Sequence, residues 1–197
     1  MSETIDAILA EEALVGAAWM LIADNNEISL GAVGLRDNLT QSAFSIDTSF
    51  HVGSLTKSLL ATGVLRLATE GQLELDAPVT RYLPRLRFDN PWRETTEVSV
   101  RHLLDHTSGL ADAHLWQLFS ERPIPQTPLI AAFPSQEQQL AIRSKPGERF
   151  SYSNMGYTLL GMIVESVTGE SYETYLDTHV LVPLGMNAST FGFTTQE

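Results

Sequence analysis

Ser54 and Lys57 stand three residues apart at the start of an apolar segment, in HVGSLTKSLL (residues 51–60). Side chains at positions i and i+3 face the same side of a helix. The first turn of a helix presents free backbone N–H groups and the positive end of the dipole, which stabilise an anion forming there. The same field disfavours a second positive charge, so a buried Lys57 could be partly neutral and accept a proton. The pair is a candidate nucleophile and base, although a capped helix with a solvated lysine has the same spacing.

A second candidate element is FSYSNMGYTLLG (residues 150–161). Tyr152 and Asn154 flank Ser153 in an extended stretch that runs into a helix. A tyrosine near a serine–lysine pair can relay a proton to a leaving group, and an asparagine amide can hold a substrate carbonyl. Taken alone, the pattern also fits a half-buried tyrosine followed by an asparagine that caps the helix.

Several segments together resemble a known family. The stretches that carry the resemblance are FHVGSLTKSLLATGVLRLATEGQLELDAPVTRYLP (50–84), VRHLLDHTSGL (100–110) and KPGERFSYSNMGYTLLGMIVESVTGESYETYLDTHVLVPLGM (145–186). They resemble the penicillin-recognising serine hydrolases, which include class C β-lactamases, D-Ala-D-Ala carboxypeptidases and family VIII-type esterases, and which share an S-x-x-K signature. The blocks occur in the family's order and cover most of residues 40–192, which makes them more specific together than any one motif.

The resemblance implies a role for four residues. Ser54 matches the acylated nucleophile, Lys57 its partner base, Tyr152 the tyrosine of the second motif, and Asn154 the asparagine that contacts the substrate. It implies acyl transfer through an acyl-enzyme, without a cofactor, on a β-lactam, a D-amino-acid peptide or an ester. It leaves open whether Lys57 or Tyr152 takes the serine proton.

The resemblance also implies an α/β (α+β) fold of the β-lactamase/transpeptidase type. In this fold an antiparallel sheet is flanked by helices, and a helical lobe is inserted. We expect one domain over residues 1–197. Its parts are a hairpin side at 1–53, a mainly helical lobe at about 54–170 and a return segment at 171–197.

One departure from the family pattern concerns its third motif. No K-T-G or H-x-G sequence follows Asn154. In the family, the strand that carries it supplies the second oxyanion donor, and losing one such donor typically costs about 3–4 kcal/mol. We therefore expect a chain that lacks its C-terminal strands, with little turnover and an unpaired apolar edge that needs a strand-completing partner or a dimer. The alternative function is a non-catalytic pseudoenzyme, a binding module or an inactive fragment.

Hydrophobic periodicity predicts the elements of the N-terminal half. A first helix should follow Ser2 or Thr4. Apolar runs at 16–24 and 28–34 predict a β-hairpin whose first strand is buried on both faces. The stretch from Ser54 to Glu70 has almost no polar face, which predicts a core helix that Gly71 ends.

The C-terminal half is expected to be helical, with a loop-rich, variable segment at 111–134. Its predicted helices are a short one after Ser99 (100–106), one from Ser135 to Ser144, one over 154–169 ended by Gly169, and a last one capped by Ser171.

Composition restricts the partners. The 197 residues carry a net charge of −12 and include no cysteine. An acidic chain without a basic patch is unsuited to nucleic acid or an anionic membrane, so a small molecule or peptide is the expected substrate. No apolar run reaches membrane-spanning length. The N-terminus lacks a basic region before an apolar core, so the chain as given is expected to be cytoplasmic, and periplasmic or secreted if a leader is missing.

Two weaker patterns suggest other kinds of site. His102 and His106 stand four residues apart, as metal ligands on a helix could, but no H-E-x-x-H arrangement accompanies them, so they are expected to be structural and no metal is predicted. Gly31 and Gly34 follow a hairpin turn and open no helix, which argues against a nucleotide fingerprint.

Overall fold

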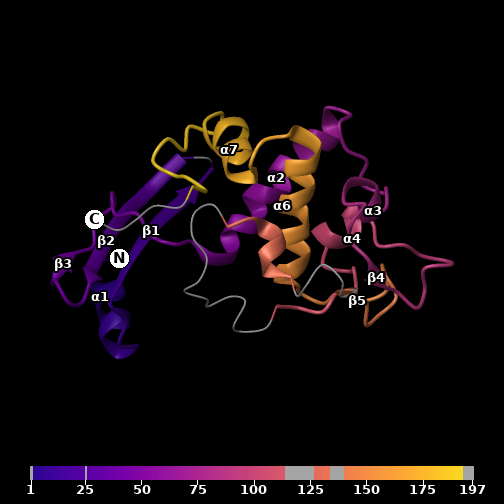
Figure 1. Ribbon diagram of the computed structural model, residues 1–197. Helices are drawn as coiled ribbons and strands as arrows, with labels where there is room; N and C mark the ends of the chain where they lie inside the picture. Colours follow the sequence, from indigo (N-terminus) through magenta and orange to yellow (C-terminus); the bar gives the residue numbers. More distant parts are fainter. Residues whose placement is uncertain (1, 25, 114–126, 134–139, 193–197) are drawn as a thin grey trace. The chain divides into compact units, whose positions relative to one another are not determined.

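The computed structural model describes residues 2–24, 26–113, 127–133 and 140–192 (Figure 1). The chain divides into two compact units, Met1–His51 and Val52–Glu197. Each unit is described by itself below. Among the described residues, no helix combines the length and the apolar character that crossing a bilayer requires.

The first unit holds helix α1 (Ser2–Glu11) and an antiparallel sheet of three strands. The strands are β1 (Gly16–Ala23), β2 (Asn26–Asp37) and β3 (Ser42–Ala43), in the order β1-β2-β3. β1 and β2 form the predicted hairpin, with Gly16 opposite Gly34 and Ala23 opposite Asn26. α1 contacts β2.

Within the first unit, the first strand is not buried on both faces as predicted. Met20, Leu21 and Ile22 in β1 are 55%, 42% and 58% exposed. Within this unit β1 is an edge strand with β2 on one side only. An uninterrupted apolar run therefore does not distinguish a strand covered on both faces from an apolar edge strand.

The glycines of β2 have packing roles. A Cβ added at Gly31 would overlap the ring of Trp19, and one added at Gly34 would overlap the carbonyl of Val15. Gly34 also has a φ of 79°, which L-residues rarely adopt. Close packing within the hairpin, rather than a phosphate-binding turn, accounts for both glycines.

The second unit is mainly helical and its helices α2 and α6 lie side by side (Figure 1). Its elements are the 3₁₀ turn η1 (Gly53–Leu55), α2 (Thr56–Thr69), α3 (Val79–Tyr82), β4 (Phe88–Asp89), α4 (Val100–Leu104), the 3₁₀ turn η2 (Leu129–Ala132), β5 (Leu140–Ala141), α6 (Asn154–Thr168), α7 (Tyr172–Leu176) and the π-helical turn η3 (Asp177–Leu181).

The core of this unit forms where α2 meets α6 and α7. Fully buried aliphatic side chains come from all three helices: Val64, Leu67, Leu159, Leu160, Ile163, Val164 and Leu176. Gly63 permits this contact, because a Cβ there would lie 2.6 Å from Leu176 Cδ2. The predicted core helix is confirmed for the face that carries Leu60, Gly63, Val64 and Leu67, whereas Leu65 is 47% exposed within this unit. Within this unit α2 buries one face against α6.

The predicted helix boundaries in this unit are largely confirmed. Ser99 and Ser171 cap α4 and α7 by accepting hydrogen bonds from the backbone N–H groups of His102 and Thr174. Gly169 ends α6 in the left-handed conformation, with a φ of 76°. Gly71 follows α2 with a φ of 73°.

The helix predicted from Ser135 to Ser144 is wrong where the structure describes it. Leu140 and Ala141 form β5, which pairs in parallel with β4, and Ile142 bridges to Leu110. Leu140 and Ile142 are more buried than Ala141 between them, which is the period of a strand. Ser135, the expected cap, lies outside the described residues.

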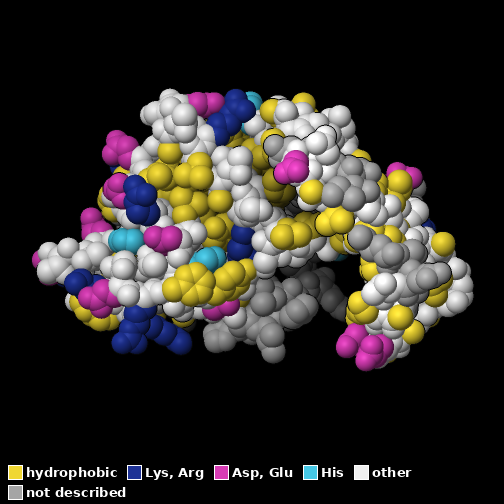
Figure 2. Space-filling view, turned by 180° about the vertical axis from the view of Figure 1, so that it is seen from behind, with side chains coloured by type: hydrophobic (Ala, Val, Ile, Leu, Met, Phe, Trp, Pro, Cys, Tyr) yellow, Lys and Arg dark blue, Asp and Glu magenta, His cyan; other side chains and the backbone are white. Residues whose placement is uncertain are grey.

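Several charged side chains on the described surface pair with the opposite charge. Arg66 contacts Glu70, Arg81 contacts Glu74, Arg101 contacts Asp76 and Lys145 contacts Glu148. On the face shown in Figure 2, Lys and Arg side chains lie in separate groups, several of them next to acidic ones.

Candidate active site

Ser54 lies in the 3₁₀ turn η1, immediately before α2 begins at Thr56. The sequence predicted that the helix begins at Ser54, and the structure places this residue in the 3₁₀ turn that leads into the helix. Gly53 has a φ of 55°, and a Cβ added there would meet nothing within 4 Å. Backbone conformation rather than crowding therefore explains the glycine. Ser54 is exposed at this turn.

The structure brings Ser54, Lys57 and Tyr152 together. Tyr152 Oη donates to Ser54 Oγ at 2.7 Å, and Lys57 Nζ donates to the same oxygen at 3.3 Å. Tyr152 comes from the extended segment before α6, which lies beside α2. The packing of the two helices thus places a phenol and an amine on one serine hydroxyl, as a nucleophile with a base requires.

Asn154 joins the same group through Lys57. Its Oδ1 accepts from Lys57 Nζ at 2.8 Å. The sequence left open that Asn154 caps the helix, but the cap is Ser153, whose Oγ accepts from the backbone N–H of Gly156 at 3.1 Å. The Asn154 side chain is therefore available for the lysine.

Asp112 fixes the orientation of Asn154. Its carboxylate accepts from the Asn154 backbone N–H at 2.6 Å and from Asn154 Nδ2 at 3.2 Å. Because the amide nitrogen points at Asp112, the amide oxygen faces Lys57. Sequence reasoning missed Asp112, which lies 42 residues from Asn154 and in no recognisable motif.

Aromatic rings surround the lysine ammonium group. Lys57 Nζ lies 4.8 Å from the centroid of the Tyr152 ring and 5.7 Å from that of Tyr157. Such contacts between a cation and a ring face are attractive. Tyr157 is itself fixed, because its hydroxyl donates to the carbonyl of Leu104 at 3.0 Å.

The electrostatic surroundings of Tyr152 favour its phenolate. Burial acts to raise the pKa of Tyr152, but hydrogen bonding to Lys57 and Ser54 and the positive charge of Lys57 outweigh it, so that the pKa lies below its ordinary value. A phenol with a lowered pKa is ionised to a larger extent near neutral pH, and only the ionised phenolate can accept the serine proton.

The two histidines each accept a hydrogen bond from the backbone. His102 Nδ1 accepts from Ser99 N at 3.2 Å and thereby completes the cap of α4. His106 Nδ1 accepts from Ser153 N at 3.2 Å. These contacts give both rings structural roles.

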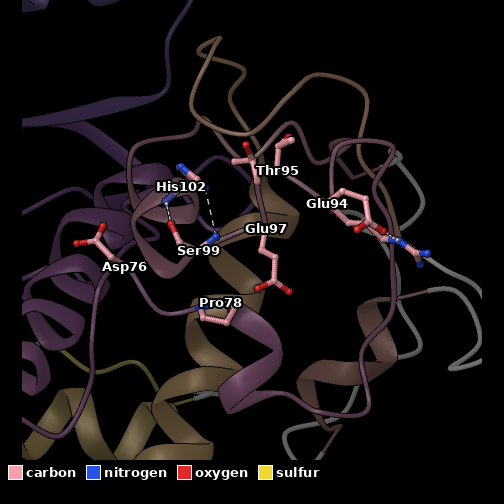
Figure 3. Close-up of a pocket in the computed structure, with 9 residues that line it drawn as sticks. Asp76, Pro78, Glu94, Thr95, Glu97, Ser99 and His102 are labelled. Carbon is pink, nitrogen blue, oxygen red and sulfur yellow. Dashed lines mark hydrogen bonds and ion pairs between the residues drawn. The ribbon is translucent and has the colours of Figure 1, made fainter.

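A pocket of about 460 Å³ lies beside α4 (Figure 3). It is lined by Asp76, Pro78, Arg93, Glu94, Thr95, Thr96, Glu97, Ser99 and His102. Figure 3 shows the two hydrogen bonds between Ser99 and His102 in its wall. Since the lining includes none of the residues around Ser54, geometry rather than pocket size identifies the candidate site.

The model of the family described as Beta-lactamase matches residues 1–197, which is the whole chain. The chain belongs to the beta-lactamase family. Members of this family among curated proteins include esterase EstB from Burkholderia gladioli. It is 33% identical over 197 residues, which cover 94% of this chain and 49% of the esterase.

Solved beta-lactamase-family structures show the same fold. The octameric penicillin-binding protein homologue from Pyrococcus abyssi has a TM-score of 0.78 and 33% identity, over 94% of this chain and 42% of that one. D-amino acid amidase from Ochrobactrum anthropi SV3, complexed with L-phenylalanine, has a TM-score of 0.72 and 31% identity, over 95% of this chain and 50% of that one. This chain spans 38% to 49% of the length of curated relatives that it matches.

Proposed function

We propose that this chain carries the nucleophile of a serine hydrolase that works through an acyl-enzyme, with Ser54 as the acylated residue. The observation that supports this most is the convergence of Tyr152 Oη at 2.7 Å and Lys57 Nζ at 3.3 Å on Ser54 Oγ. A lone exposed serine needs no such neighbours. A nucleophilic serine needs a base within hydrogen-bond reach.

In the proposed reaction, Ser54 Oγ attacks the carbonyl carbon of the substrate while its proton passes to Tyr152 Oη, the nearer of the two neighbours. Lys57, beside the ring, stabilises the phenolate that accepts this proton. The tetrahedral intermediate expels the leaving group, which takes the proton from Tyr152. Water then attacks the acyl-enzyme, releasing the acid and restoring the Ser54 hydroxyl.

The proposed substrates are esters, amides of D-amino acids and β-lactams. All three present a carbonyl that accepts an oxygen nucleophile. Relatives support this range, because one is an esterase, one a D-amino acid amidase and one a penicillin-binding protein homologue. Asn154, held by Asp112 next to Lys57, is the proposed contact for the substrate carbonyl or amide.

A covalent label tests the proposal. The purified chain is incubated with a fluorophosphonate, its intact mass is measured, and the labelled peptide is sequenced. We expect one adduct, at Ser54, that is absent in Ser54→Ala. Ser58→Ala is the matched control, because Ser58 lies one turn further along and its Oγ donates to the Leu55 carbonyl at 2.6 Å.

Adduct formation that persists in Ser54→Ala would refute the assignment of the nucleophile. A folded chain that forms no adduct at all would instead support the non-catalytic binding module.

A further inference from the structure

His106 holds the segment that carries Tyr152 at two points. Its backbone carbonyl accepts from the Ser151 N–H at 2.8 Å, and its ring Nδ1 accepts from the Ser153 N–H at 3.2 Å. The two donors are the residues on either side of Tyr152. One residue therefore fixes the backbone both before and after the proposed proton acceptor.

The ring of His106 also packs on the phenol itself. Its centroid lies 4.4 Å from that of Tyr152, with the planes tilted by 30°, and 5.0 Å from that of Tyr157, tilted by 31°. The ring of Phe150 forms a T-shaped contact with that of His106, with the centroids 5.6 Å apart. Stacking of this kind limits the rotation of a side chain that is otherwise 40% exposed.

The backbone of His106 is in an uncommon conformation. Its φ is 58°, in the left-handed region that few non-glycine residues occupy. His106 follows Asp105, the residue that caps the C-terminus of α4. A residue held in a sparsely populated conformation beside a candidate active site is a reason to look for a positioning role.

We propose that His106 is a positioning residue that holds the Tyr152 hydroxyl on Ser54 Oγ. This inference rests on the proposed function, because it assigns to His106 the placement of the group that takes the serine proton. The role requires a neutral imidazole, since Nδ1 accepts a hydrogen bond and must be unprotonated.

The surroundings agree with a neutral ring. Burial lowers the pKa of His106, and the positive charge of Lys57 lowers it further, while Asp105 and Asp112 act in the opposite direction. Among the described residues, the aromatic rings that pack against the His106 ring are those of Tyr152, Tyr157 and Phe150.

Two substitutions separate placement from folding. His106→Gly removes the ring but accepts a φ of 58° without strain. His106→Asn restores a side-chain acceptor, because asparagine tolerates the left-handed region and its Oδ1 can take the place of Nδ1. We expect His106→Gly to slow fluorophosphonate labelling of Ser54 about tenfold, and His106→Asn to recover most of that loss, since small displacements of a reacting group are costly.

His102→Ala is the matched control. His102 accepts a backbone hydrogen bond of the same length, 3.2 Å, through the same nitrogen, but it serves the cap of α4 (Figure 3). It should lower thermal stability without changing the labelling rate. Equal labelling rates in wild type and His106→Gly would overturn the proposal, as would equal loss in His106→Gly and His102→Ala.

A double-mutant cycle shows whether His106 acts through Tyr152. In a Tyr152→Phe background, His106→Gly should cause no further loss of labelling. The full tenfold loss in that background would mean that His106 acts on Ser54 by another route, and the proposal would be wrong.

A second readout does not depend on reactivity. In protein with ¹³C-labelled tyrosine, the Tyr152 signal is assigned by its disappearance in Tyr152→Phe and is titrated with pH. Its pKa should move up toward the ordinary tyrosine value in His106→Gly, because the phenol leaves Lys57 and Ser54. An unchanged Tyr152 pKa in His106→Gly would refute the positioning role, even if Ser54 were never labelled. A raised pKa in a chain whose Ser54 is never labelled would refute only the proposed function.

Discussion

Lys57 Nζ lies closer to Asn154 Oδ1, at 2.8 Å, than to Ser54 Oγ, at 3.3 Å. The amine is thus anchored by an amide that is itself held by Asp112. A chain of contacts from Asp112 through Asn154 to Lys57 sets the distance between the amine and the serine. The predictions below follow from this chain and from the packing that supports it.

Lys57→Met should slow labelling of Ser54 at least about 100-fold. Methionine keeps a long unbranched side chain but lacks the ammonium group that lies beside Tyr152 and Ser54. General acid–base contributions are typically 10²–10⁴-fold. Stopped-time labelling followed by mass spectrometry gives the rate. Lys145→Met, which removes an exposed partner of Glu148, should leave the rate unchanged.

Asp112→Asn should slow labelling about five- to tenfold. An asparagine can present its own NH₂ group to Asn154, which lets that amide turn its oxygen away from Lys57. The comparison variant is Asp76→Asn, which loses only an exposed ion pair with Arg101. Crystallography or NMR can show whether Asn154 Oδ1 still accepts from Lys57 in Asp112→Asn. If it does, and if Ser54 is labelled at the wild-type rate, the prediction is wrong.

Tyr152→Phe should remove a pH-dependent step from labelling. Hydrogen bonding to Lys57 and Ser54 outweighs burial and lowers the Tyr152 pKa below its ordinary value of 10.0. In wild type the rate should therefore rise with pH through a pKa below 10.0, as the phenolate forms. The phenylalanine variant should be slow and lack this rise. A wild-type pH profile in Tyr152→Phe would assign the proton acceptor to Lys57 instead.

The pH dependence of stability should report the burial of His106. Its folded pKa is lowered, first by burial and then by Lys57, so protonation favours the unfolded chain. Stability should be intact above the ordinary histidine pKa of 6.5 and fall as the pH drops below it toward the folded pKa. Urea unfolding at several pH values measures this fall. The loss of stability at low pH should be smaller in His106→Asn than in wild type. An equal loss in the two proteins would mean that a group other than His106 causes it.

Leu67→Ala should lower the free energy of unfolding by about 2–5 kcal/mol, because its side chain has no exposed surface and the cavity would not fully collapse. Leu65→Ala on the same helix should change it much less, since Leu65 is 47% exposed. Urea denaturation of the two variants makes the comparison. Similar losses would mean that α2 is covered on both faces.

Local patterns in the sequence were enough to locate the main helices of the second unit. Ser99, Gly169 and Ser171 bound α4, α6 and α7 through hydrogen bonds and a left-handed φ that depend on near neighbours. β5 could not be found in this way, because its pairing with β4 links segments about 50 residues apart and its two residues show no period by themselves.

The candidate site was predictable only where motifs marked it. Ser54, Lys57, Tyr152 and Asn154 belong to two short motifs, and the structure brings them together. Asp112 and His106 act on Asn154 and on the Tyr152 segment across 42 and 47 residues. These roles depend on the path by which the chain brings residues 106 and 112 to the start of α6. Residue types and their spacing do not reveal that path.

The contacts at Ser54 join parts of the chain that are distant in sequence. Tyr152 and Asn154 stand 98 and 97 positions from their partners Ser54 and Lys57. Closing a loop of that length costs conformational entropy and slows folding. The η1–α2 segment alone would carry Ser54 and Lys57 without Tyr152 and Asn154. Full reactivity at Ser54 would therefore appear during refolding only after α6 has docked. A covalent probe of this serine would therefore measure when these distant parts of the chain come together. Helix formation, which precedes this step, would be measured separately.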